Sequence, residues 1–123
     1  MDVITNYRNK IREIFILPVT NCENEDKVKS QKFNRTIKTM MQKLFPDCTI
    51  YPIPDCWCYA DGFIEKDGKY VFYSFSDFRW WPWDKDILIR TATSLKDFTG
   101  GRNNYANLED LQPSVYKLFN INF

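Results

Sequence analysis

Residues 56–76 read CWCYADGFIEKDGKYVFYSFS and carry the strongest structural signal in the chain. An Asp-Gly pair between two apolar runs is typical of a two-residue hairpin turn, because both residue types tolerate a positive φ. The pattern therefore predicts strands over residues 56–65 and 69–76, joined at Asp67 and Gly68. This turn sets the register, which pairs Glu65 with Tyr70, Ile64 with Val71 and Phe63 with Phe72.

Alternation along the two predicted strands gives the hairpin two faces. One face carries Cys58, Ala60, Ile64, Val71, Tyr73 and Phe75. The other face carries Tyr59, Asp61, Phe63, Glu65, Tyr70 and Phe72. The first face is the more apolar of the two, so we expect it to line the core.

Two further strands are predicted on either side of the hairpin. Residues 48–53 have the composition of a short strand, but Pro52 and Pro54 each remove a backbone donor, which places this strand at an edge of the sheet. Residues 86–93, DILIRTAT, have the composition of another strand. Residues 94–107 are rich in Gly and Asn, and we expect them to form a long connection.

Apolar residues at helical spacing predict three helices. The first covers residues 2–16, with Asp2 as its N-cap and Tyr7 in its apolar stripe. The second begins near residue 25 and ends before Pro46. The third lies near the C-terminus, where Pro113 interrupts the pattern. We expect one short turn there, followed by a helix that has Pro113 in its first turn.

The predicted elements follow the order α-α-β-β-β-β-α, with no internal repeat and no linker. A chain of 123 residues can bury roughly two thirds of its unfolded surface in one core, and it is too short for two domains. We therefore expect a single α+β domain over residues 1–123. The simplest architecture is an antiparallel sheet of about four strands with the helices packed on one face.

The composition excludes several kinds of chemistry. The chain contains no histidine, which removes Ser-His and Cys-His nucleophiles and HExxH zinc sites. No segment has the roughly twenty apolar residues of a membrane span or the apolar core of a signal peptide, so we expect a cytoplasmic protein without a membrane partner. There, Cys22, Cys48, Cys56 and Cys58 are expected to be free thiols; the alternative, a zinc site, lacks CxxC spacing. We expect no metal and no cofactor.

Basic residues dominate one side of the second predicted helix. Residues 1–46 contain nine basic and five acidic side chains, whereas residues 47–123 contain eight basic and eleven acidic ones. No acidic residue lies between Lys27 and Pro46. This side is either a solvated surface or an electrostatic footprint for nucleic acid or an acidic protein. The basic face comprises Lys27, Lys29, Lys32, Arg35, Lys38 and Lys43.

The most unusual segment is DFRWWPWDKD, residues 77–86. Three tryptophans in four positions cannot all point inward in so short a connection, especially with Pro82 fixing the backbone, so at least one indole ring should be exposed. Three interpretations stay open: a loop folded over the sheet edge, an interface with a protein, or a platform for nucleobases. The candidate partner-binding residues are Phe78, Arg79, Trp80, Trp81 and Trp83, with Arg102 from a later loop.

That later loop contains two consecutive glycines, Gly100 and Gly101, before Arg102. Successive glycines allow backbone amides to converge on an anion, and an arginine can clamp it. The segment lacks the spacing of a phosphate-binding P-loop, so an ordinary connection is the favoured interpretation.

A further pattern concerns metal-dependent hydrolysis. Asp55, which follows a proline, together with Asp67 and Lys69, resembles the PD...(D/E)xK motif of metal-dependent nucleases, in which the two acids hold a divalent cation. In that family the second half of the motif lies along a strand, whereas here it forms the tip of the predicted hairpin. We therefore assign no catalytic residue.

The preferred hypothesis is a non-enzymatic binding module that docks on a protein or ribonucleoprotein. The aromatic segment would anchor the partner and the basic helix would steer it. Direct binding of nucleic acid and a metal-dependent nuclease are the alternatives, and exposed aromatic rings are also compatible with a homodimer. A small domain of this kind resembles phage and mobile-element inhibitors of bacterial defence nucleases, by analogy of type alone.

Overall fold

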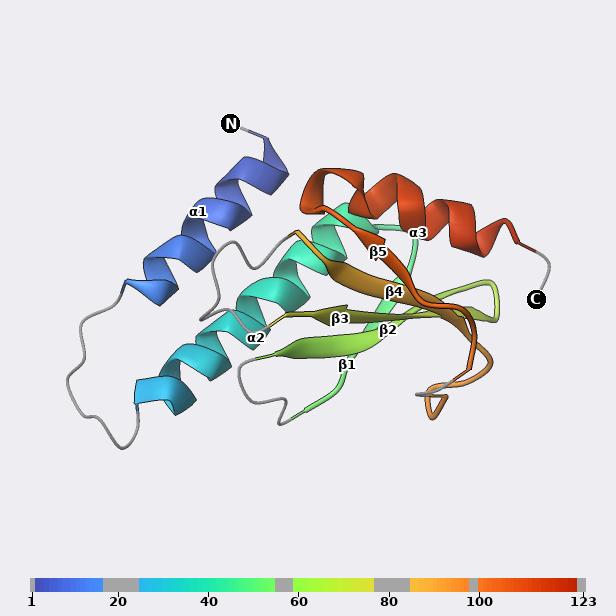
Figure 1. Cartoon of the computed structure of the whole chain (residues 1–123), viewed down its shortest axis with the longest axis horizontal. Helices are drawn as coiled ribbons and strands as arrows, with labels where there is room; N and C mark the ends of the chain where they lie inside the picture. The colour runs from blue at the N-terminus through green and yellow to red at the C-terminus, as the bar shows by residue number, and fades with distance from the viewer. Residues whose placement is uncertain (1, 17–24, 55–58, 77–84, 98–99, 122–123) are drawn as a thin grey trace.

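The structure, a computed structural model, describes residues 2–16, 25–54, 59–76, 85–97 and 100–121. These residues form an α+β fold with three α-helices, a short 3-10 helix and a five-stranded antiparallel sheet (Figure 1). Along the chain the elements are α1 (Val3–Phe15), α2 (Glu25–Leu44), β1 (Thr49–Pro52), β2 (Ala60–Lys66), β3 (Lys69–Phe75), β4 (Ile87–Ala92), β5 (Asn104–Ala106), η1 (Leu108–Asp110) and α3 (Leu111–Phe119).

The predicted hairpin is confirmed as the pair β2 and β3. Asp67 and Gly68 have φ values of 53° and 78°, the left-handed conformation that the two-residue turn requires. The register is the predicted one, with Phe63 opposite Phe72. β1 lies at one edge of the sheet, as its prolines required, and the strand order is β1-β2-β3-β4-β5.

The prediction of about four strands is wrong, because the sheet has five. β5 lies inside the segment 94–107, which was expected to be a connection, and it pairs with β4 through Ile87 and Ala106. It is only three residues long, with two of them exposed, so its own sequence has no strand periodicity. Pairing with the edge of β4, and not local propensity, makes this segment a strand.

The core lies between the sheet and the helices. The face of the hairpin that was expected to line the core does so through Ala60, Ile64, Val71, Tyr73 and Phe75, while Cys58 lies outside the described residues. The same cluster includes apolar residues of all three helices. From β4 it takes Ile87 and Ile89, and from the helices Tyr7, Ile11, Phe33, Ile37, Met40, Leu111 and Val115, among others.

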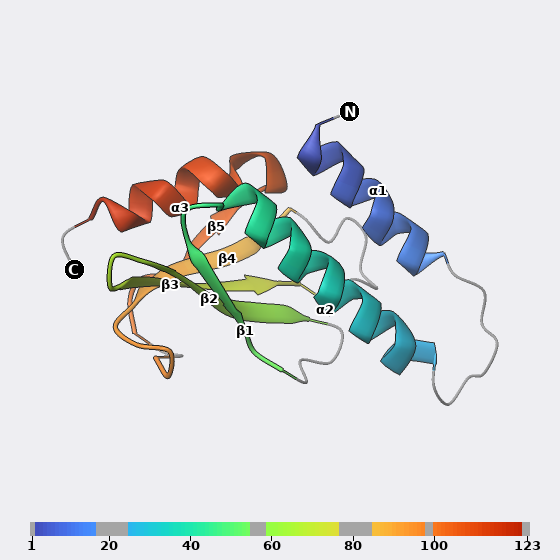
Figure 2. The same cartoon turned by 180° about the vertical axis from the view of Figure 1, so that it is seen from behind.

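The helices form a layer over one face of the sheet. α2 contacts β1 and β2, and α3 contacts β3 and β4. α1 packs beside α2 and runs in the opposite direction, which both views show (Figures 1 and 2). α2 therefore lies between α1 and the sheet edge that β1 and β2 form.

The other face of the sheet has a smaller apolar cluster. Phe63, Phe72 and Ala92 are buried there, and the two phenyl rings meet edge to face at 5.3 Å. The guanidinium of Arg90 lies 4.5 Å from the centre of the Phe72 ring. Asp61 accepts a hydrogen bond from the Ser74 hydroxyl at 2.6 Å, and burial raises the pKa of this carboxyl above its usual value.

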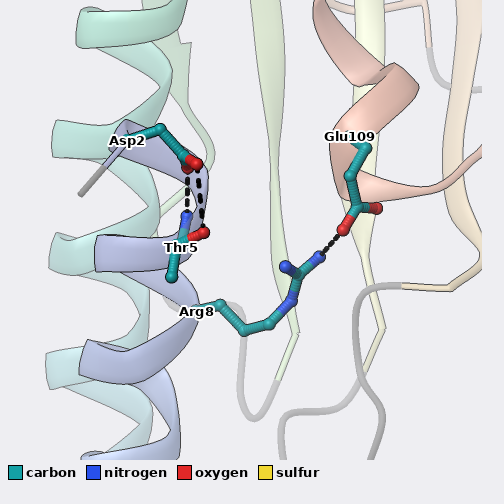
Figure 3. Close-up of polar contacts among 4 residues, drawn as sticks. All are labelled: Asp2, Thr5, Arg8 and Glu109. Atoms are coloured by element: carbon teal, nitrogen blue, oxygen red, sulfur yellow. Dashed lines mark hydrogen bonds and ion pairs between the residues drawn. The ribbon is translucent and has the colours of Figure 1, made fainter.

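Side chains fix the N-terminal half of α1 (Figure 3). Asp2 is the N-cap, as predicted, and its carboxylate accepts hydrogen bonds from the Thr5 amide at 2.7 Å and from the Thr5 hydroxyl at 3.2 Å. One turn further on, Arg8 forms an ion pair of 2.5 Å with Glu109 of η1. This pair joins the first helix to the C-terminal part of the chain.

The C-terminal ends of α2 and α3 are also tied to other elements. The Gln112 amide of α3 donates to the carbonyl of Leu44, the last residue of α2, at 2.5 Å. The Lys69 ammonium of β3 donates to the carbonyl of Phe119 at 3.2 Å. Both bonds satisfy carbonyl groups that a helix end leaves without an internal partner. They fix the two helices on the sheet.

Candidate functional site

α2 presents its basic residues on the side that faces away from the core. The helix buries an apolar stripe from Phe33 to Leu44, which leaves the remaining circumference for polar side chains. Five of the basic residues are exposed, namely Lys27, Lys32, Arg35, Lys38 and Lys43, and Lys29 is half-buried.

The basic residues divide between two flanks of α2. Lys32 and Arg35 line a groove against α1, and Lys43 extends over a tyrosine ring of that helix. At 100° per residue, Lys27 and Lys38 lie on the other flank, away from α1. The predicted basic face is therefore not one flat surface, and a single ligand on the α1 side would meet only part of it.

The groove between α1 and α2 has a volume of about 300 Å³. On the α2 side, the positions i, i+4 and i+7 of one helical row form the wall, so the groove follows the helix axis. The lining contains three basic side chains and no acidic one. Its residues are Tyr7, Lys10 and Ile14 of α1 and Lys32, Arg35, Thr36 and Thr39 of α2.

Tyr7 connects the cations of the two helices. The ammonium nitrogens of Lys10 and Lys43 lie 4.7 Å and 5.5 Å from the centre of the Tyr7 ring. Both distances are within the range in which the electron-rich face of an aromatic ring attracts a cation. The side chain is 2% exposed, and its hydroxyl has no hydrogen-bond partner among the described residues. Tyr7 thus holds two positive charges beside the groove and keeps one buried polar atom unpaired.

The two threonines of the groove donate their hydroxyl protons to the helix itself. Thr36 donates to the carbonyl of Lys32 at 2.7 Å, and Thr39 donates to the carbonyl of Arg35 at 3.0 Å. A hydroxyl has only one proton to donate. The side-chain donors available to a ligand are consequently Lys10, Lys32 and Arg35.

The glycine loop before β5 uses its amides internally. The Gly100 amide donates to Asp97 Oδ1 at 2.7 Å, and the Thr93 amide donates to Asp97 Oδ2 at 2.9 Å. A carboxylate of the chain occupies the position that an external anion would have taken. Arg102 follows this loop and is exposed, on a different element from the basic face.

The aromatic segment falls outside the described residues. Phe78, Arg79, Trp80, Trp81 and Trp83 all belong to the gap between β3 and β4. Their role in binding a partner stays a prediction from the sequence.

The nuclease-like pattern has its second half at the hairpin tip. Asp67 is exposed in the turn, and the Lys69 ammonium donates to a helix carbonyl. Asp55 lies outside the described residues. In the part of the chain that the structure describes, no group of three or more Asp, Glu or Cys side chains is arranged to hold a metal ion.

A second polar cluster joins the turn after α2 to β2 and α3. Asp47 accepts hydrogen bonds from the Tyr116 hydroxyl and, at 3.4 Å, from the Cys48 thiol, and it pairs with Lys66 at 3.1 Å. Burial, followed by the neighbouring carboxylate, raises the pKa of the Cys48 thiol to about 11. The thiol is protonated at neutral pH, so it is a weak nucleophile. The cluster has a structural role.

Sequence reasoning missed the α1 half of the groove. Tyr7 was assigned to the apolar stripe of α1, and Lys10 was not singled out. The spacing within each helix was visible, but the approach of the two helices is a long-range contact that no local pattern encodes. The available signal was that Lys10 follows the core residue Tyr7 by three positions, so that both lie on the same side of the helix.

Comparison with models of protein families, with curated proteins and with solved structures gives no significant match to this chain. Within the described ranges, no helix combines the length and the apolar character needed to cross a lipid bilayer. The residues of the chain are therefore the only basis for a functional proposal.

Proposed function

We propose that this protein is a non-enzymatic binding module that docks on another macromolecule through the basic face of α2. The observation that supports this most is the exposure of Lys32, Arg35 and Lys38 on a helix that contains no acid from Lys27 to Pro46. Without acids at i±4, the helix does not neutralise these charges itself. These cations are therefore available to attract an anionic partner.

The preferred partner is a protein or ribonucleoprotein with an anionic surface. The basic face steers the encounter, and Phe78, Arg79, Trp80, Trp81 and Trp83, with Arg102, supply anchors and polar contacts. Such a module acts in the cytoplasm by covering a functional surface, as an inhibitor of a bacterial defence nuclease from a phage or mobile element would. The proposal assigns it no catalytic residue, metal or cofactor.

Direct binding of nucleic acid is the second candidate. It is favoured by one observation, the groove in which Lys10, Lys32 and Arg35 converge from two helices. Contacts between cations and backbone phosphates supply most of the affinity of sequence-independent nucleic-acid binding.

Capture from cell lysate with matched charge-reversal variants tests the proposed function. The face variant replaces Lys32, Arg35 and Lys38 with Glu. The control replaces Arg12, Lys96 and Lys117 with Glu. These three residues are also exposed, and their replacement changes the net charge equally. Partners identified by mass spectrometry should be retained by the wild type and the control, and reduced roughly tenfold or more with the face variant.

Circular dichroism verifies that both variants are folded before capture. A lysate treated with ribonuclease and deoxyribonuclease separates the two candidates, because a partner bound through its protein surface survives the treatment and one bound through nucleic acid is lost. Equal capture by the face variant and the wild type would reject the basic face as the docking surface. In the preferred version, Trp81→Ala with Trp83→Ala also abolishes capture and leaves the fold intact.

A further inference from the structure

We propose that the groove between α1 and α2 binds the phosphate groups of a single-stranded nucleic-acid backbone. This inference rests on the binding function proposed above and names its ligand. The three side-chain donors of the groove come from two helices, so their arrangement requires the tertiary fold.

The donors match phosphate chemistry. Arg35 presents a planar fork that can bind two oxygens of one phosphate, whereas Lys10 and Lys32 act as point charges on flexible stems. No acidic side chain lines the groove to compete for them. Tyr7 also lines the groove, but its hydroxyl is buried and is not counted among the donors.

The size of the groove limits the ligand. A volume of about 300 Å³ is at the small end of ligand sites, which range from roughly 300 to 1,000 Å³. This space suits a phosphate with part of its sugars, but not a folded segment of protein. The groove also follows the α2 axis, so a linear chain can run along it.

The spacing of the cations favours a repeating polyanion over an isolated carboxylate. From Lys32 to Lys43 the helix rises about 16 Å, at about 1.5 Å per residue. Lys43 lies with Lys10 over the Tyr7 ring, so positive charge continues beyond the groove. Successive phosphates of one strand can pair with these charges in turn, whereas one carboxylate meets only one of them.

The hydroxyl protons of Thr36 and Thr39 are committed to the helix backbone. The groove therefore offers only charged donors, which suit the phosphate oxygens that every nucleotide carries, and contacts to phosphate carry no information on base sequence. Binding should be insensitive to base sequence and strongly dependent on salt.

Fluorescence anisotropy with a labelled oligouridylate tests the site. The probe has about 20 nucleotides, more than the roughly 4 to 16 that single-strand sites cover. The groove variant is Lys32→Gln with Arg35→Gln. Its matched control, Lys27→Gln with Lys38→Gln, removes the same charge from the other flank of the same helix. Each protein is titrated between about 50 and 200 mM salt.

The groove variant should bind about tenfold more weakly than the wild type, and its salt slope should fall by about 1.4, or 0.7 for each lost contact on a single strand. The control should lose clearly less affinity than the groove variant, because Lys27 and Lys38 belong to the basic face but do not line the groove. A third variant, Thr36→Leu, keeps every charge and fills part of the groove with a residue of high helix propensity. This variant should weaken binding as well, because the leucine side chain occupies the space that the phosphate would fill.

Three results would overturn the inference. If the control loses as much affinity as the groove variant, the charge of α2 matters but the groove does not, and the proposed docking function stands. If the wild type does not bind the probe, the phosphate ligand is wrong, and lysate capture still decides the docking function. If polyglutamate displaces the probe as efficiently as unlabelled oligouridylate does, the groove takes carboxylates and the ligand is an acidic polypeptide.

Discussion

Asp47 shows how a single side chain joins three elements of the fold. Its carboxylate follows α2 and contacts Tyr116 of α3 and Lys66 of β2. The pKa of Asp47 is about 2, below its ordinary value of 3.8. The main cause is the hydrogen bond from Tyr116, and the second is the contact with Lys66. The Lys66 ammonium also lies 5.2 Å from the centre of the Tyr116 ring. The ionised carboxylate is thus the form that the fold favours.

The depressed pKa of Asp47 fixes how stability depends on pH. The contribution of the ionised carboxylate to the free energy of unfolding is complete above about pH 4, and it is lost as the pH falls toward 2. Tyr116→Phe removes the main cause of the shift and keeps the ring that packs on Phe45. The variant should be less stable than the wild type near neutral pH, and the difference should shrink on acidification. Urea unfolding at several pH values measures this.

The control is Tyr105→Phe, which removes a hydroxyl from a ring that is 64% exposed. Its stability relative to the wild type should not change between neutral pH and pH 2. A penalty for Tyr116→Phe that stays constant over the same range would mean that the hydroxyl acts through packing and not through the charge of Asp47.

Within the elements, Gly62 permits the close pairing of β2 with its neighbours. A Cβ atom at this position would lie 2.6 Å from the ring carbon Cζ of Tyr73 and 2.8 Å from the carbonyl oxygen of Tyr51. Tyr73 is the strand partner of Gly62 in β3 and is 1% exposed. The glycine therefore gives the tyrosine ring room to cross the strand.

Gly62→Ala should destabilise the fold by about 1 to 3 kcal/mol, because the added methyl overpacks this site. In a Tyr73→Leu background the ring is gone, and the penalty of the alanine should fall by about 0.5 kcal/mol or more. A double-mutant cycle by denaturant unfolding measures the coupling. In the matched background Phe45→Leu, which lies outside the sheet, the effects of the two substitutions on the free energy of unfolding should be additive. Additive effects in both backgrounds would show that the Tyr51 carbonyl alone excludes a side chain at position 62.

How far each element could be predicted depends on where its determinants lie. The hairpin was predicted with its register because Asp67 and Gly68 set the turn and alternation sets the faces. β5 was missed because three residues from Asn104 to Ala106 contain too little pattern, and the free edge of β4 selects them. The N-cap of α1 was visible in Asp2, a local signal, whereas the Arg8–Glu109 pair spans the whole chain.

At the scale of the whole molecule, the candidate site is a tertiary feature. The basic residues of α2 could be listed from the sequence, but their division between a groove flank and an outer flank depends on where α1 packs. Lys10 and Tyr7 belong to the site because α1 and α2 lie side by side (Figure 2). The aromatic segment between β3 and β4 stays a prediction, since it lies outside the described residues.

The groove proposed to bind phosphate exists only while α1 is docked, so α1 has to stay packed on α2 for as long as the sheet is folded. Ile11 of α1 belongs to the main core, whereas Phe63 of β2 belongs to the cluster on the opposite face. Because both clusters share one sheet, the variants Ile11→Val and Phe63→Leu should each unfold in a single transition. Each substitution should lower the free energy of unfolding by about 0.5 to 1.5 kcal/mol. Far-UV circular dichroism follows the helices, and near-UV dichroism follows the aromatic packing.

Val28→Ala is the control, because Val28 is exposed on α2 and alanine favours a helix. The midpoint of its unfolding transition should stay unchanged or rise slightly. Coincident far-UV and near-UV curves in all three variants would mean that α1 stays docked as long as the sheet is folded, and Lys10 then remains beside Lys32 and Arg35 whenever a ligand arrives. If Ile11→Val instead produces an early far-UV transition, α1 detaches independently. The groove would then be assembled for only part of the time, and the affinity for phosphate would fall by the fraction of molecules in which α1 is undocked.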